Sequence, residues 1–135
     1  MSQENVEAFK RGIEAYNRRD VEALLEVHDP DVEWHPVLQV LLGGEATVYR
    51  GHDGIREFVR DLDEAFAEAH IEVSEIRDMG DRLVAIGRLH ARGKASGADT
   101  ESPIGYVADF KNGKAIRIRS WLDPREALEA AGLSE

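Results

Sequence analysis

The segment that decides the fold class is PIGYVADFKNGKAIRIRSW, residues 103–121. Two runs of alternating apolar and polar residues flank Asn112-Gly113, a dipeptide typical of a tight hairpin turn. The pattern predicts two antiparallel strands, residues 103–110 and 114–121, with one face of the hairpin turned toward a core.

The length of the turn determines which residues pair. A two-residue turn places Tyr106 opposite Arg119, whereas a three-residue loop that includes Lys111 places Tyr106 opposite Ile118. The first register would bury arginines with the apolar row, and burying an unpaired charge is costly. The sequence therefore predicts the three-residue loop. The expected inner face is Ile104, Tyr106, Ala108, Phe110, Ile116, Ile118 and Ser120, and the expected outer face is Val107, Asp109, Arg117, Arg119 and Trp121.

The spacing of apolar residues changes once along the chain, near residue 68. Before it, steps of three and four predict helices that begin near residues 2, 20 and 51, with a short strand at 32–35. After it, a period of two predicts strands at 71–76 and 82–91, with Gly87 and Leu89 turned inward, a loop at 93–102, the hairpin, and a last helix after Asp123-Pro124. This order predicts an α+β domain in which three N-terminal helices cover one face of an antiparallel sheet.

Composition narrows the function classes. The chain has 135 residues, no cysteine and a net charge of −10, so one domain over residues 1–135 without disulfides or thiol chemistry is expected. Nucleic acid would be repelled by most of such a surface. No apolar run approaches the roughly 18 residues that span a bilayer, and the first residues do not resemble a signal peptide. We expect a cytoplasmic protein with no nucleic-acid or membrane partner.

Several stretches, in this order and spacing, resemble the SnoaL-like, ketosteroid-isomerase-like branch of the nuclear transport factor 2-like superfamily. They are EAYNRRDV at 14–21, DPDVEWHP at 29–36, YRG at 49–51, IREF at 55–58, NGK at 112–114 and WLD at 121–123. The resemblance covers nearly the whole chain. It implies a cone-shaped, strongly bent antiparallel sheet around helices, an enclosed apolar pocket and a homodimer through the sheet. Because this fold supports isomerases, polyketide cyclases, dehydratases, epoxide hydrolases and binding proteins, it implies no single activity.

The resemblance also suggests where chemistry would occur. In ketosteroid isomerase an aspartate base works with a tyrosine and a protonated aspartate that hold an oxyanion. Those three positions fall here on His35, Gly12 and Tyr106, so none of the three residues is retained. His35 can still move a proton, Tyr106 can donate to an oxyanion, and Glu33, two residues away on the same strand face, can orient the histidine. The catalytic hypothesis is proton transfer on a small apolar carbonyl compound.

Three alternatives remain open. A non-enzymatic binding protein would use the same apolar wall without a tuned histidine. A water nucleophile, as in epoxide hydrolysis, would need Asp109 and Arg119, which the predicted register turns outward. His28, Asp31, Glu33 and His35 crowd one segment, but without a helical pair of histidines we expect no metal site and no cofactor. The residues expected to line a pocket for a small apolar ligand are Ile13, Tyr16, Phe58, Leu62, Ile104 and Ile118. Loop 37–48, with Gly43-Gly44, is a candidate lid.

Overall fold

The computed structural model describes residues 2–41 and 44–133. Its helices are α1 (Ser2–Arg18), α2 (Val21–Val27), α3 (Leu38–Leu41), α4 (Gly51–Ala65) and α5 (Pro124–Ala130). Its strands are β1 (His28–His35), β2 (Tyr49–Arg50), β3 (Phe66–Asp78), β4 (Arg82–Gly93), β5 (Asp99–Lys111) and β6 (Lys114–Trp121). The predicted α+β class is confirmed. The predicted loop at 93–102 is shorter than expected, because β5 already begins at Asp99. The candidate lid at 37–48 contains the short helix α3, and its Gly43 lies outside the described residues.

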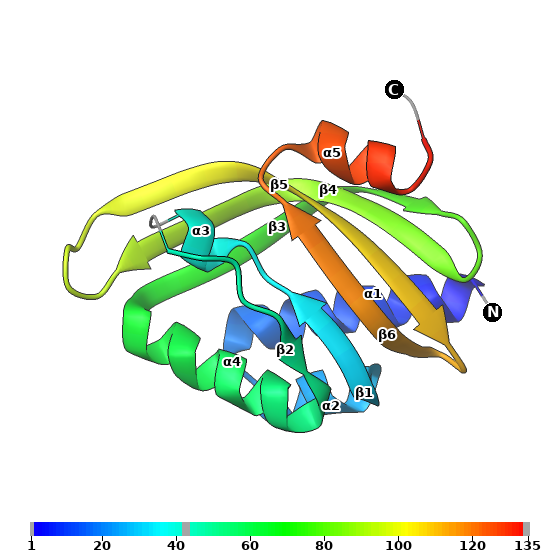
Figure 1. Ribbon diagram of the computed structural model, residues 1–135, viewed down its shortest axis with the longest axis horizontal. Helices are drawn as coiled ribbons and strands as arrows, with labels where there is room; N and C mark the ends of the chain where they lie inside the picture. Colours follow the sequence, from blue (N-terminus) through cyan, green and yellow to red (C-terminus); the bar gives the residue numbers. More distant parts are fainter. Residues whose placement is uncertain (1, 42–43, 134–135) are drawn as a thin grey trace.

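The six strands form one curled sheet in the order β2-β1-β6-β5-β4-β3. All neighbours are antiparallel except β1 and β6, which run parallel with Trp34 beside Ile118. The prediction of a purely antiparallel sheet is wrong at this pair, because β1 lies far from β6 in sequence and joins it only in the tertiary fold. Figure 1 shows α1, α2 and α4 under the concave side of the sheet and α5 over its convex side.

The bend of the sheet has a local cause in β3 and β4. The pairing of β3 with β4 shifts register between Phe66 and Glu68 and again between Val73 and Glu75, as expected for bulges that bend a strand. Gly87 faces Val73 at the second shift, and a Cβ atom there would lie 2.1 Å from the carbonyl oxygen of Glu72. Only glycine allows this close backbone approach. Leu89 is buried in the main core, so the predicted inward facing of β4 is confirmed.

The final hairpin corrects the predicted loop. Lys111 pairs with Lys114, which leaves the two-residue turn Asn112-Gly113, with φ angles of 53° and 78° as a type I′ turn requires. The register then shifts between Asp109 and Phe110, so that Tyr106 pairs with Ser120 and Ala108 with Ile118. This bulge at Ile116 keeps the arginines on the outer face despite the short turn. The predicted faces are therefore confirmed except at Ile116, which is only half-buried, while Ala115 takes its place in the core.

Two further contacts hold the helices on the sheet. The side-chain amide of Asn17, at the end of α1, donates to the carbonyl oxygen of Ile71 (2.9 Å) and accepts from its N–H (2.8 Å). This pair of hydrogen bonds satisfies the backbone of Ile71 at the free edge of β3. On the convex side, α5 buries Val84 and Val107 in a second, smaller core. Part of the predicted outer face is thus covered by the chain itself.

Candidate functional site

The concave side of the sheet encloses a cavity of about 40 Å³, measured as the space that the centre of a water molecule can occupy. Helices α1, α2 and α4 supply one wall and the sheet supplies the other. Among the residues that the structure describes, no Asp, Glu, Lys or Arg lines it. Its lining residues are Ala8, Phe9, Gly12, Ile13, Tyr16, Leu24, Val27, His28, Trp34, Ile55, Phe58, Ile71, Tyr106, Phe110, Ala115 and Ile118.

A second, smaller cavity of about 10 Å³ adjoins it toward α3. It adds Pro36, Val37, Leu38, Leu89, Ile104 and Ser120 to residues that line both cavities. The shared residues are Tyr16, Trp34, Phe58, Ile71 and Tyr106. This set, called the aromatic partition below, separates the two spaces.

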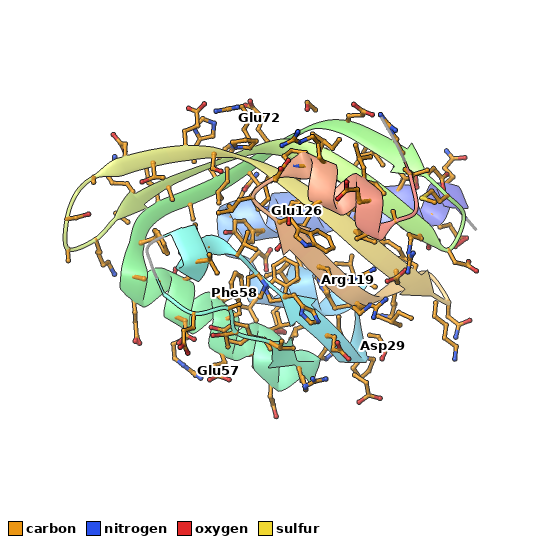
Figure 2. All side chains as sticks on the ribbon, turned by 45° about the horizontal axis from the view of Figure 1, so that its top comes forward. Asp29, Glu57, Phe58, Glu72, Arg119 and Glu126 are labelled. Atoms are coloured by element: carbon orange, nitrogen blue, oxygen red, sulfur yellow. The ribbon has the colours of Figure 1, made fainter. Side chains whose placement is uncertain are left out.

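Aromatic contacts hold the partition together. The rings of Trp34 and Tyr106 are nearly parallel, with an interplanar angle of 12° and centroids 6.4 Å apart. The ring of Phe58 meets that of Trp34 edge-on, with centroids 5.5 Å apart, and its centroid lies 6.0 Å from that of Tyr16. Figure 2 shows Phe58 pointing into the space between α4 and the sheet, whereas the neighbouring Glu57 points away from it. Flat apolar surfaces thus dominate the centre of the site.

Five of the six predicted pocket residues line these cavities. Ile13 and Ile118 line the larger one, Ile104 lines the smaller one, and Tyr16 and Phe58 line both. Leu62 does not; it lies one turn further along α4, in a separate depression beside Tyr49 and Asp61.

The cavity wall carries a few polar groups among its apolar surfaces. Burial raises the pKa of Tyr16, and burial, followed by the neighbouring Tyr16, raises the pKa of Tyr106, so both hydroxyls remain protonated and can donate. Trp34 is 8% exposed, and its Nε1–H has no hydrogen-bond partner among the described residues. A buried N–H without an acceptor costs about 1–3 kcal/mol. A ligand with an acceptor oxygen would remove that cost.

The fourth polar group of the cavity, His28, was not predicted to belong to the pocket. It caps the C-terminus of α2, is 4% exposed, and its Nδ1 lies 2.6 Å from the carbonyl oxygen of Leu24. Burial lowers its pKa, so the ring is neutral near pH 7. Sequence reasoning missed it because its neighbours Asp29 and Pro30 are polar and turn-forming, which gives no sign of a buried position.

The predicted catalytic residues do not meet at one point. Glu33 and His35 are in contact, with 3.0 Å between Oε1 and Nε2, and Arg50 lies 3.2 Å from the other oxygen of Glu33. The side chains of Glu33 and His35 are about a third exposed, however, and His35 is not among the described residues that line either cavity. Tyr106 is 3% exposed and faces the interior.

Strand alternation explains the separation. In β1, Trp34 pairs with Ile118 on the inner face, so Glu33 and His35, on either side of it, face outward. His35 pairs with Arg119, on the outer face. The grouping of His35 and Glu33 is therefore found, but a shared site with Tyr106 is not. The hydrogen bond to His35, and more weakly the ion pair with Arg50, lowers the pKa of Glu33, so this cluster carries a carboxylate at neutral pH.

The sequence pattern of the SnoaL-like domain matches residues 9–118. The chain belongs to the SnoaL-like domain family. Curated protein sequences yield no match. Among solved structures, the chain is similar to a nuclear transport factor 2-like protein of unknown function from Burkholderia pseudomallei K96243, with 25% identity over 93% of this chain and 95% of that one and a TM-score of 0.79.

Two other structures extend the comparison. TerC, co-crystallised with polyporic acid, is 27% identical over 93% of this chain and 96% of that chain, with a TM-score of 0.76. A protein with a ketosteroid isomerase-like fold from Catenulispora acidiphila DSM 44928, in complex with trimethylamine, is 13% identical over 94% of this chain and 93% of that one, with a TM-score of 0.75. The last likeness concerns the fold alone. These neighbours confirm the cone-shaped fold that the sequence predicted.

The outer face of this SnoaL-like domain carries a second charged cluster. Asp109 contacts Arg82 (2.6 Å), Arg117 (3.3 Å) and Arg119 (3.9 Å). The predicted outward facing of Asp109 and Arg119 is confirmed, and neither lines a cavity. Among the described residues there is no group of three or more histidines, cysteines and acids that could hold a metal ion, and no helix long and apolar enough to cross a membrane.

Proposed function

We propose that this SnoaL-like protein binds one small, uncharged, mostly apolar molecule in the space between its sheet and its helices. The observation that carries the proposal is the buried Nε1–H of Trp34, which lacks an acceptor inside an apolar wall. Ligand sites typically combine such walls with a few placed polar groups. The co-crystallisation of TerC with polyporic acid supports a small-molecule ligand for this branch of the family.

The size of the cavity sets a condition on binding. With about 40 Å³ open to the centre of a water molecule, the larger cavity has room for only a few waters. A ring-containing ligand therefore requires the aromatic partition to move and join the two cavities. The four aromatic side chains of the partition can shift at moderate cost, because they meet one another through ring contacts, each worth about 0.5–1.5 kcal/mol.

Tryptophan fluorescence tests this proposal. The chain has two tryptophans, and Trp121 lies on the outer face beneath Arg119, so Trp121→Phe leaves Trp34 as the only reporter. We expect uncharged aromatic and carbonyl compounds to change the Trp34 emission saturably and to raise the unfolding temperature. The matched variant Trp34→Phe should lose the fluorescence response. Binding that changes Trp121 but not Trp34 would place the ligand elsewhere and reject the proposal.

A second candidate is general acid–base chemistry of isomerase, cyclase or dehydratase type on a small apolar carbonyl compound. The contact between His35 Nε2 and Glu33 Oε1 favours it, because a carboxylate beside a histidine orients the ring for proton transfer. Tyr106 would not be the oxyanion donor of that reaction, since it lies on the other face of the sheet.

Proton exchange at carbon, followed by NMR in deuterated buffer over a panel of ketones, separates the two candidates. Exchange that is lost in His35→Gln but kept in Tyr106→Phe would support chemistry at the outer cluster. Ligand binding without exchange in the wild-type protein would favour the binding role alone.

We also propose a homodimer through the outer face of the sheet. Arg117 and Trp121 remain partly exposed there, and arginine and tryptophan are enriched at interfaces. Helix α5 restricts this surface, because it already covers Val107. Sedimentation equilibrium of the wild-type protein and of Arg117→Glu should show a dimer that the charge reversal weakens. A wild-type monomer at all accessible concentrations would refute it.

A further inference from the structure

His28 offers the cavity a hydrogen-bond acceptor whose identity follows from its other contact. Its Nδ1 lies 2.6 Å from the carbonyl oxygen of Leu24, and a carbonyl oxygen can only accept. The ring proton is therefore on Nδ1, which donates to Leu24. In the neutral ring this leaves a lone pair on Nε2.

The surroundings keep that lone pair available. His28 is almost fully buried and stays neutral near pH 7, because burial, with a smaller effect of His52, lowers its pKa. The described residues give Nε2 no hydrogen-bond partner. In the wall its ring meets that of Trp34 edge-on, with centroids 6.4 Å apart, and the Trp34 Nε1–H has no partner among the described residues, so Trp34 does not satisfy this lone pair. A molecule that fills the cavity without a donor at this end would leave Nε2 unsatisfied, which is unfavourable.

We propose that His28 Nε2 accepts a hydrogen bond from a hydroxyl group of the bound molecule, so that the ligands are small phenols or enols. This inference rests on the proposed binding function. The ring of such a molecule matches the flat surfaces of Trp34, Phe58 and Tyr106 in the same space. Within residues 2–41 and 44–133, no Asp, Glu, Lys or Arg lines either cavity, which favours an uncharged hydroxyl over a phenolate or a carboxylate. His28 is in this view a residue that determines specificity and sets the orientation of the ligand.

Phenol and benzene are matched probes, because they differ only in the hydroxyl group. We expect phenol to bind the wild-type protein about tenfold more tightly than benzene, as one added buried hydrogen bond would give. In His28→Asn, the side-chain amide can still donate to Leu24, but its acceptor Oδ1 lies two bonds from Cβ, whereas Nε2 lies three bonds away, so Oδ1 does not reach the position of Nε2. That variant should lose the preference for phenol while keeping its affinity for benzene within about twofold. NMR titration of cavity methyl groups, such as those of Ile13 and Ile118, reports both affinities.

A second readout does not depend on a variant that folds. In protein labelled with ¹⁵N at histidine, phenol should shift the Nε2 resonance of His28 and leave its Nδ1 resonance in place, and benzene should shift neither strongly. Equal binding of phenol and benzene with no change at Nε2 would overturn the inference while the cavity remains a binding site. If neither probe reached the cavity methyls, the proposed function would fail as well.

Discussion

Lowering the pH from about 7.5 to about 5.5 should destabilise the wild-type protein relative to His28→Asn, because the variant lacks the buried imidazole whose pKa falls on folding. The unfolded chain binds a proton at His28 near its ordinary pKa of 6.5, whereas burial lowers the pKa of the same group in the folded protein. The unfolded state therefore binds more protons below pH 6.5. The stabilisation is fully present above that pH and is lost as the pH falls toward the folded pKa.

The magnitude follows from linkage. If the folded protein stays unprotonated at His28 down to pH 5.5, the free energy of unfolding falls by about 1.4 kcal/mol over this interval, and by less if the folded pKa is reached sooner. Urea denaturation at three pH values gives the free energy of unfolding of both proteins. Effects of other groups cancel in the difference between wild type and variant, and lost packing at residue 28 adds only a constant offset.

A difference between the two proteins that stays flat across the interval would refute the reasoning. It would mean that His28 is as accessible to protons in the folded state as in the unfolded chain. The buried ring with its Nδ1 bonded to Leu24 would then not describe the protein in solution, and the acceptor assigned to Nε2 would fall with it.

Three further predictions concern other contacts. Asn17→Ala should lower the free energy of unfolding by about 2 kcal/mol in urea denaturation, since it removes two hydrogen bonds at the edge of β3; the exposed Glu14→Ala on the same helix should change little. Gly87→Ala should destabilise the protein by about 3 kcal/mol or more, because the added Cβ would collide with the backbone of β3. Gly12→Ala, whose Cβ would meet Val27 at 3.5 Å, should instead stabilise α1 by about 0.5–1 kcal/mol. Thermal unfolding that gave both changes the same sign would contradict this. His35→Ala should raise the pKa of Glu33 more than Arg50→Ala does, because the hydrogen bond from His35 is the larger cause of its lowering. Carboxyl ¹³C titration decides the order.

The final hairpin shows how far sequence reasoning reaches. The requirement that arginines stay out of the apolar row correctly assigned most residues of β5 and β6 to a face. It did not identify the turn that produces this arrangement, because a three-residue loop and a two-residue turn followed by a bulge both keep the arginines on the outer face. The choice depends on the backbone twist that the whole curled sheet imposes on Asn112 and Ile116, which no local pattern contains.

The candidate site divides in the same way. Alternation along β1 predicted that Glu33 and His35 share a face, and their contact bears this out. Alternation also puts Trp34, between them, on the opposite face. That Tyr106 lies on the face of Trp34 and not on theirs became clear only from the parallel pairing of β1 with β6, which joins segments more than 80 residues apart.

The sequence by itself determined the α+β class, the covered face of the sheet and the resemblance to SnoaL-like proteins, and five of the six residues that it predicted for the pocket line the cavities, because strand and helix periodicity record which side chains are buried. Only the tertiary structure decided that His28 is inside and His35 outside. Each of the two histidines lies within two residues of a proline, and the local pattern does not tell which is buried. Their difference arises from packing: His28 lies at the junction of α2 and β1, in contact with Leu24 and Trp34, whereas His35 leaves the strand on the convex side of the sheet, away from the helices.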